Sequence, residues 1–182
     1  MLLTLSELES SGALNELKYS NRGIEKESLR IDKKGKISQN PHNEELGSPL
    51  TNPFLTTDFS EALLELITPT FNDPQECLDF LSDIHAFIYK RIDDELLWSC
   101  SMPCPISESE KIPIANFGNS NAGILKTIYR KGLSERYGSM MQAIAGIHYN
   151  FSFSEGFFKR IYENSSDVGD LQTLKNDLYL KI

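Results

Sequence analysis

Acidic side chains in two short segments of the sequence could form a metal site. Glu25 and Glu27 stand two positions apart in the segment 23–31, whose composition predicts a β-strand, so both carboxylates would point to one face. Glu65 is the lone charged residue of the apolar run 63–67. If these segments share a sheet, three carboxylates meet on one surface. Two carboxylates about 4 Å apart repel by roughly 4 kcal/mol at an effective dielectric of about 20, so such a cluster requires protons, basic partners or a cation.

A further polar face is expected in the segment 146–153, where polar and apolar residues alternate as in a strand. His148, Asn150 and Ser152 would share this face. Carboxylate oxygens suit Mg²⁺ or Mn²⁺, which commonly lie between carboxylates and nucleotide phosphates. The three segments together therefore suggest a metal site with an imidazole nearby.

Each of these acids also has an ordinary structural explanation. Glu25 and Glu27 alternate with Lys26, as on the solvated face of an edge strand. A short helix with Glu61 and Glu65 on its solvent side would explain the acid in the apolar run, because periodicity alone cannot separate strand from helix there. Spacing alone therefore leaves a metal site and a solvated surface both open.

Two basic residues could meet an anionic ligand such as the phosphates of a nucleotide. Lys126 and Arg130 fall one turn apart on an expected helix, which places them on the same face. The segment 118–123 before them contains glycine but lacks the Gly-Lys-Ser/Thr ending of a phosphate-cradling loop. Solvated lysine and arginine side chains would give the same pattern.

The elements that must position these groups follow from hydrophobic periodicity and turn residues. The expected elements are a helix at 4–17, a strand at 23–31, a loop at 40–53, a helix from 74 to about 97, irregular chain at 99–113, a helix at 122–137 and a strand at 146–153. A few strands among long helices predict an α+β fold, with an antiparallel sheet and flanking helices. The chain shows no repeat or linker, so we expect no internal domain boundary within residues 1–182.

Composition excludes several classes of function. The chain has 182 residues, of which 40% are hydrophobic and 24% charged, as in an ordinary globular protein. A net charge of −8 disfavours nucleic acid as a partner. No signal peptide or membrane span is apparent. Cys77, Cys100 and Cys104 form no Cys-x-x-Cys pair, so we expect reduced thiols and a cytoplasmic location.

Four segments in order resemble successive blocks of the proteobacterial type of glutamate–cysteine ligase. These segments are GIEKESLRI (23–31), LTTDFSEALLELITP (55–69), SMPCPI (101–106) and FGNSNAGILKTIYRKGLSERYGSMMQAIAGIHYNFSF (117–153). The resemblance runs from about residue 18 to about residue 158, and it implies a glutamine-synthetase-like catalytic domain of which residues 1–182 are the N-terminal part. By this analogy 58–68 is a strand. Family members are considerably longer, so we expect the sheet to be incomplete at the C-terminus.

The resemblance also implies roles for individual residues. The metal ligands would be Glu25, Glu27 and Glu65, with Asp58 close by. His148 would be a catalytic contact to phosphate or metal. Phe59, Tyr129 and Leu133 fall where the family forms the pocket for the cysteine side chain, and the last two lie on one helix face. Lys126 and Arg130 remain the candidates for binding the nucleotide.

The implied reaction is the ATP-dependent ligation of L-glutamate, through γ-glutamyl phosphate, to L-cysteine, the first step of glutathione biosynthesis. ATP and Mg²⁺ (or Mn²⁺) are the expected cofactors, and the two amino acids are the expected substrates. The remainder of a family-length chain is the expected partner, so we expect residues 1–182 alone to be inactive. Two alternatives stay open: another ATP-dependent carboxylate–amine ligase, and a non-catalytic truncated relative.

Overall fold

A computed structural model describes residues 4–107, 109–165 and 169–180 of the chain. The chain divides into two compact units. One unit comprises residues 23–69 and 75–149, and the other comprises residues 1–22, 70–74 and 150–182. The expectation that residues 1–182 belong to one catalytic domain stays a prediction.

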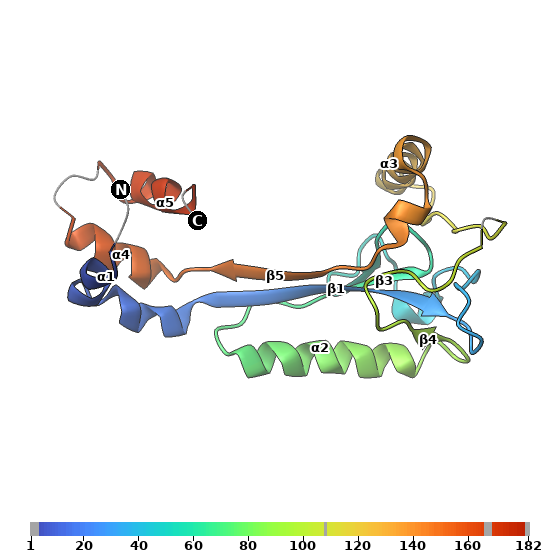
Figure 1. Cartoon of the computed structure of the whole chain (residues 1–182), viewed down its shortest axis with the longest axis horizontal. Helices are drawn as coiled ribbons and strands as arrows, with labels where there is room; N and C mark the ends of the chain where they lie inside the picture. Colours follow the sequence, from blue (N-terminus) through green and yellow to red (C-terminus); the bar gives the residue numbers. More distant parts are fainter. Residues whose placement is uncertain (1–3, 108, 166–168, 181–182) are drawn as a thin grey trace. The chain divides into compact units, whose positions relative to one another are not determined.

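The larger unit is organised around a mainly antiparallel sheet (Figure 1). Its strands are β1 (Asn21–Ile31), β2 (Leu55–Thr57), β3 (Leu63–Ile67), β4 (Leu96–Leu97) and β5 (Ile147–Ser152). The order is β2-β3-β1-β4, and β5 also pairs with β1. β1 is antiparallel to β3 and β4, and β2 is antiparallel to β3. The predicted α+β class with an antiparallel sheet and flanking helices is therefore confirmed.

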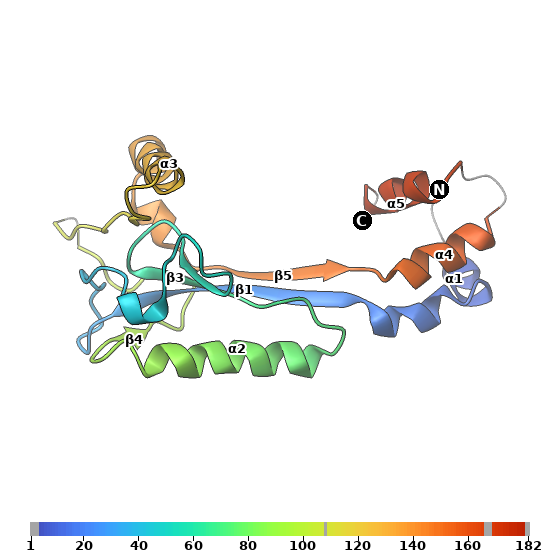
Figure 2. The same cartoon turned by 180° about the vertical axis from the view of Figure 1, so that it is seen from behind.

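One face of the sheet is covered by α2 (Pro74–Tyr89). Leu64 and Leu66 of β3 are fully buried on this face, in one core cluster with Ile84 and Ile88 of α2. Figure 1 and Figure 2 both show α2 lying along this side of the sheet, with α3 (Asn121–Tyr137) on the opposite side. The apolar spacing of α2 thus produces one continuous interface with the sheet.

The opposite face of the sheet changes from apolar to acidic along its length. Leu29 and Leu63 are fully buried on this face, in a second core cluster with Ala143 and Ala145. Side chains two positions further from this cluster on each strand point to the same face, because strand residues alternate. On β1 and β3 those positions are Glu27 and Glu65. The second core cluster therefore ends where the carboxylates begin.

A buried ion pair joins the far end of β1 to the loops around it. Arg30 is 1% exposed, and its Nη1 donates to Glu95 Oε2 at 2.6 Å. Its Nη2 donates to the backbone oxygens of Asn40, Pro41 and Glu61 at 2.8, 3.0 and 2.9 Å. A buried guanidinium is tolerable only where acceptors surround it, and here Nη1 and Nη2 have acceptors, whereas Nε has none among the described residues. Arg30 therefore fixes three loop segments to the sheet.

The smaller unit is helical. Its elements include α1 (Leu5–Ser10), a 3₁₀ segment (Ala13–Tyr19), α4 (Glu155–Glu163) and α5 (Leu171–Tyr179). They bury a core cluster of their own, which contains Ala13, Phe157, Phe158, Ile161 and Leu174. The Lys175 ammonium donates to both carboxylate oxygens of Glu155 at 2.6 and 2.7 Å, which links α5 to α4.

The predicted elements are found, with three corrections. The expected helix 4–17 is broken at Gly12, whose φ of 74° lies in the left-handed region that ends an α-helix. The expected helix from 74 to about 97 ends at Tyr89, because residues 96–97 form β4 and pair with the end of β1. The resemblance implied a strand over 58–68, but only Leu63–Ile67 form strand β3, because the chain turns at Ser60–Leu63, where the Leu63 N–H donates to the Ser60 carbonyl oxygen at 2.9 Å. All three cysteines are free.

Candidate functional site

Two glutamates face each other across neighbouring strands. In the β1–β3 register Glu27 is the direct partner of Glu65, and Thr56 of β2 is the partner of Glu65 on its other side. Burial raises the pKa of both carboxyls above the ordinary value, and the nearby Asp58 carboxylate raises each pKa further. Like charges directly opposite in a sheet are destabilising. The sheet therefore concentrates negative charge here, and a cation could neutralise it.

Glu27 is held in place by the residue that precedes β5. The Gly146 N–H donates to Glu27 Oε2 at 2.6 Å, and the Glu27 N–H donates to the Gly146 carbonyl oxygen at 2.9 Å. The first of these bonds lowers the pKa of Glu27, but burial has the larger and opposite effect. Sequence reasoning did not identify Gly146, because a backbone donor leaves no signal in a residue type.

Glu25 and His148 lie at hydrogen-bonding distance from each other. Their nearest atoms, Glu25 Oε2 and His148 Nδ1, are 3.4 Å apart. The two side chains are 35% and 61% exposed, so both remain open to solvent. This contact places the predicted catalytic imidazole at the end of the row formed by Glu25, Glu27 and Glu65, which we call the acid row.

Arg130 connects α3 to the acid row through Asp58. Its Nε donates to the Asp58 carbonyl oxygen, and its Nη2 lies 3.8 Å from Asp58 Oδ1. The Arg130 charge also lowers the pKa of Glu65, although this effect is smaller than that of burial. The predicted metal-site acid and the predicted anion-binding arginine are thus neighbours.

Lys126 and Arg130 share an aromatic support. Their cationic groups lie 4.9 and 4.4 Å from the centroid of the Phe117 ring, within the range of a cation–π contact. The predicted pairing of these two bases on one helix face is therefore present. The Arg130 guanidinium is the one of the two that reaches an acid of the candidate site.

The three residues predicted to line a cysteine pocket differ in exposure. Phe59 is 1% exposed and belongs to the interior, whereas Tyr129 is 63% exposed on α3. Leu133 on the same helix is half-buried. Only Phe59 is thus part of the interior, whereas Tyr129 lies at the surface of α3. A shared pocket stays a prediction.

The chemistry of the acid row fits a hard divalent cation, which takes carboxylate oxygens as ligands. Within the described part of the chain, however, no three His, Cys, Asp or Glu side chains are close enough together to hold a metal ion. Glu27, Glu65 and Asp58 would therefore have to change rotamers, or combine with ligands from elsewhere, to complete a coordination sphere. The structure therefore provides the negative charge that a cation needs, but not a complete arrangement of metal ligands.

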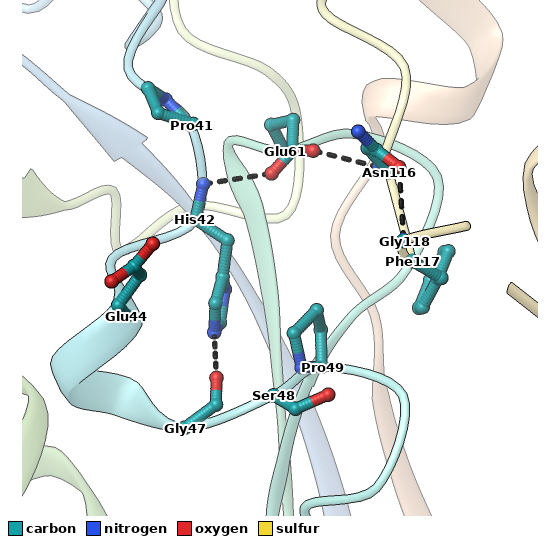
Figure 3. Close-up of a pocket in the computed structure, with 10 residues that line it drawn as sticks. All are labelled: Pro41, His42, Glu44, Gly47, Ser48, Pro49, Glu61, Asn116, Phe117 and Gly118. Atoms are coloured by element: carbon teal, nitrogen blue, oxygen red, sulfur yellow. Dashed lines mark hydrogen bonds between the residues drawn. The ribbon is translucent and has the colours of Figure 1, made fainter. Parts of the chain in front are cut away.

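A cavity of about 410 Å³ lies beside this site, between the loops 41–49 and 116–118 (Figure 3). Glu61 bridges the two loops: its Oε2 accepts from the His42 N–H at 2.8 Å and its Oε1 from the Asn116 N–H at 2.7 Å. Burial lowers the pKa of His42, whose Nε2 lies 3.0 Å from the Gly47 carbonyl oxygen. Sequence reasoning gave Glu61 no role in a site and considered it only as a solvent-facing residue of a possible short helix.

The glutamate–cysteine ligase family model matches residues 5–182. The match covers nearly the whole chain, beyond the 18–158 range seen from motifs, and it defines the class of protein. The chain belongs to the glutamate–cysteine ligase family.

Individual relatives agree with this assignment. A glutamate–cysteine ligase of Alcanivorax borkumensis is 51% identical over 83% of this chain, and one of Pseudomonas putida strain W619 is 55% identical over 78% of it. These matches cover 29% and 27% of the two relatives. The chain thus spans about 30% of the length of the curated relatives it matches.

Two solved structures resemble this one. A glutamate–cysteine ligase from Francisella tularensis, in complex with AMP, has a TM-score of 0.77 and 43% identity, over 80% of this chain and 29% of that chain. A bifunctional glutathione synthetase from Pasteurella multocida has a TM-score of 0.86 and 31% identity, over 96% of this chain and 22% of that chain. In addition, none of the helices among the described residues has the length and apolar character needed to cross a membrane.

Proposed function

We propose that this chain contributes one wall of the active site of an ATP- and Mg²⁺-dependent glutamate–cysteine ligase, which joins the γ-carboxylate of L-glutamate to the amine of L-cysteine in the cytoplasm. The observation that carries the proposal is the direct opposition of Glu27 and Glu65 across β1 and β3, with the pKa of both carboxyls raised by burial and by the nearby Asp58. Like charges held close together in a partly buried place are typical of sites that bind a cation or a reacting group. Mn²⁺ could replace Mg²⁺ at such a site.

The reaction requires activation of a carboxylate, which is a poor acylating group. Transfer of the γ-phosphoryl group of ATP to the glutamate γ-carboxylate gives an acyl phosphate and ADP, and attack by the cysteine amine then releases phosphate. When bound, a divalent metal would neutralise phosphate charge and align the transferring group. Glu25, Glu27, Glu65 and Asp58 would hold it, and no nucleophilic side chain is needed.

The cationic side of the site would bind the anionic parts of the substrates. Arg130 is supported by Phe117 and by Asp58, so its guanidinium is fixed at small entropic cost. Lys126 would add a second positive charge toward the nucleotide, and His148 would contact phosphate or metal from the far end of the acid row. These roles separate metal binding on the strands from anion binding on α3.

The proposal is tested with Glu27→Gln and Glu65→Gln in the protein at the length of its relatives. We expect each variant to lose at least about tenfold in Mg²⁺-dependent ATP turnover, which corresponds to about 1.4 kcal/mol. Glu135→Gln, an exposed change on α3, is the matched control and should leave turnover unchanged. Unaltered rates and unaltered metal dependence in both strand variants would remove the acid row from the mechanism.

A second candidate is another carboxylate–amine ligase with a different acceptor. One of the similar structures is named a bifunctional glutathione synthetase, which is the observation that favours this second candidate. A product assay with cysteine, ammonia and other small amines separates the two, because the first candidate requires γ-glutamylcysteine as the main product. A different main product would favour the second.

A further inference from the structure

Glu61 is a buried carboxylate that takes no part in the acid row. It is 8% exposed, and its two oxygens accept from two different backbone N–H groups, those of His42 and Asn116 (Figure 3). These donors lie 19 and 55 residues away in the sequence. Hydrogen bonds to an ionised acceptor are stronger than neutral ones, and a buried carboxylate needs them. We call this arrangement the Glu61 clamp.

The backbone of Glu61 is fixed as firmly as its side chain. Its N–H donates to the Pro113 carbonyl oxygen at 3.0 Å, and its own carbonyl oxygen accepts from Arg30 Nη2 at 2.9 Å. The neighbouring Ser60 hydroxyl donates to the same Pro113 oxygen at 2.7 Å. The carboxylate therefore extends from a rigid base, so it can set the position of the chain that it binds.

The Glu61 clamp holds the segment 115–117, against which the first turns of α3 pack. A Cβ added to Gly123 would lie 2.4 Å from the Phe117 carbonyl oxygen, so the first turn of α3 is in close contact with that backbone. The Thr127 hydroxyl, one turn further on, donates to the Ala115 carbonyl oxygen at 3.3 Å. Phe117 is 4% exposed, and its ring supports Arg130. The clamp is thus one residue away from the ring on which the guanidinium rests.

We propose that Glu61 is a positioning residue of the site: through Asn116 and Phe117 it sets where α3 presents Arg130 to Asp58 and the acid row. The catalytic purpose of this role rests on the proposed function, whereas the hydrogen bonds of Glu61 do not depend on it. Glu61 itself would touch neither substrate nor metal. The cavity between the two loops follows from the clamp, since the carboxylate holds the loops in place on either side of it.

The test uses ¹⁵N-labelled protein at the length of its relatives and follows two kinds of signal, the backbone amides of His42 and Asn116 and the Arg130 Nε–H. In Glu61→Gln one acceptor oxygen becomes an NH₂ group that cannot accept, so we expect exchange of the Asn116 or the His42 amide to accelerate about tenfold. We also expect the Arg130 Nε–H signal to shift. Glu44→Gln, an exposed acid of the same cavity, is the matched control and should move neither signal.

A second variant separates the two steps and remains informative if Glu61→Gln fails to fold. Phe117→Leu removes the ring beneath Arg130 but leaves the Asn116 N–H in place, so only the Arg130 signal should move. An unchanged Arg130 signal in either folded variant overturns the positioning role. Because neither signal depends on turnover, failure of the ligase assay in the wild-type protein would count against the proposed function and not against the clamp.

Discussion

Replacing Glu65 by glutamine should make the metal-free protein more stable at neutral pH. The substitution keeps the size and shape of the side chain and removes one of two charges that face each other across β1 and β3. Burial raises the pKa of Glu65, so the folded protein disfavours its ionised form, and the charges of Asp58 and Glu27 add to this effect. A partly buried charge that lowers the stability of the fold, as Glu65 does, is typical of a functional site.

The magnitude follows from the geometry of the pair. Like charges directly opposite on an antiparallel pair destabilise by roughly 0.2–1 kcal/mol, and both carboxylates are half-buried and so partly screened by solvent. We therefore expect Glu65→Gln to stabilise the fold by about 0.5–1 kcal/mol at pH 7.5. For a chain of this size that corresponds to a rise in Tm of roughly 1–4 °C.

The sign of the pH dependence provides a second check. The unfolded chain ionises near the ordinary glutamate pKa, whereas the folded chain ionises at higher pH. The stability that Glu65 contributes is therefore fully present below the ordinary pKa and is lost as pH rises through the raised one. The advantage of Glu65→Gln should be full at pH 7.5 and should vanish below about pH 4, where both side chains are neutral.

Thermal unfolding of wild-type and variant protein, with and without Mg²⁺, measures both effects. Mg²⁺ should raise the Tm of the wild-type protein, because a ligand that binds only the folded state stabilises it by mass action. The same addition should have a smaller effect on Glu65→Gln. A variant less stable than wild type at pH 7.5 would show that Glu27 and Glu65 do not repel each other appreciably. Equal stabilisation of both proteins by Mg²⁺ would show that Glu65 does not bind the ion.

Three other outcomes are expected. In the protein at the length of its relatives, Tyr129→Ala should raise the KM for cysteine about 5- to 150-fold and that for glutamate far less, because a side-chain pocket contact is worth about 1–3 kcal/mol. Equal effects on both would place the pocket elsewhere. Glu95→Ala should lower the free energy of unfolding by about 3–5 kcal/mol in urea titrations, since it leaves the Arg30 charge buried without its partner, and a change below about 1 kcal/mol would show that solvent reaches that charge. Residues 1–182 alone should self-associate, because β5 exposes apolar side chains such as Ile147 along an edge, and should release no γ-glutamylcysteine; steady turnover by a monodisperse preparation would contradict this.

Much of the fold could be predicted from local patterns. Composition and a following turn located β1, alternation with a period of two located β5, and helical spacing located α2 and α3, because these patterns depend on neighbours close in sequence. The two errors in helix extent have a different origin. Ile92 continues the apolar spacing of α2, but Leu96 and Leu97 pair with β1, and only the folded chain supplies that partner.

In the candidate site, too, some features depend on residues close in sequence and others on contacts between distant segments. The sequence by itself determined that Glu25 and Glu27 share a face, since the geometry of a strand requires it. It could not determine that Glu65 lies opposite Glu27, because cross-strand register depends on pairing between distant segments. Nor could it show that Gly146 holds one acid of the row.

Glu61 is the case that only the tertiary structure could decide. Its residue type predicts a solvated acid, and its two N–H partners belong to backbone, which carries no residue-specific signal. Residues 42 and 116 come together only in the folded chain, where Arg30 also binds the backbone oxygens of Asn40 and Glu61. A carboxylate is stable in the interior once those donors surround it, so the environment, and not the residue, determines its role.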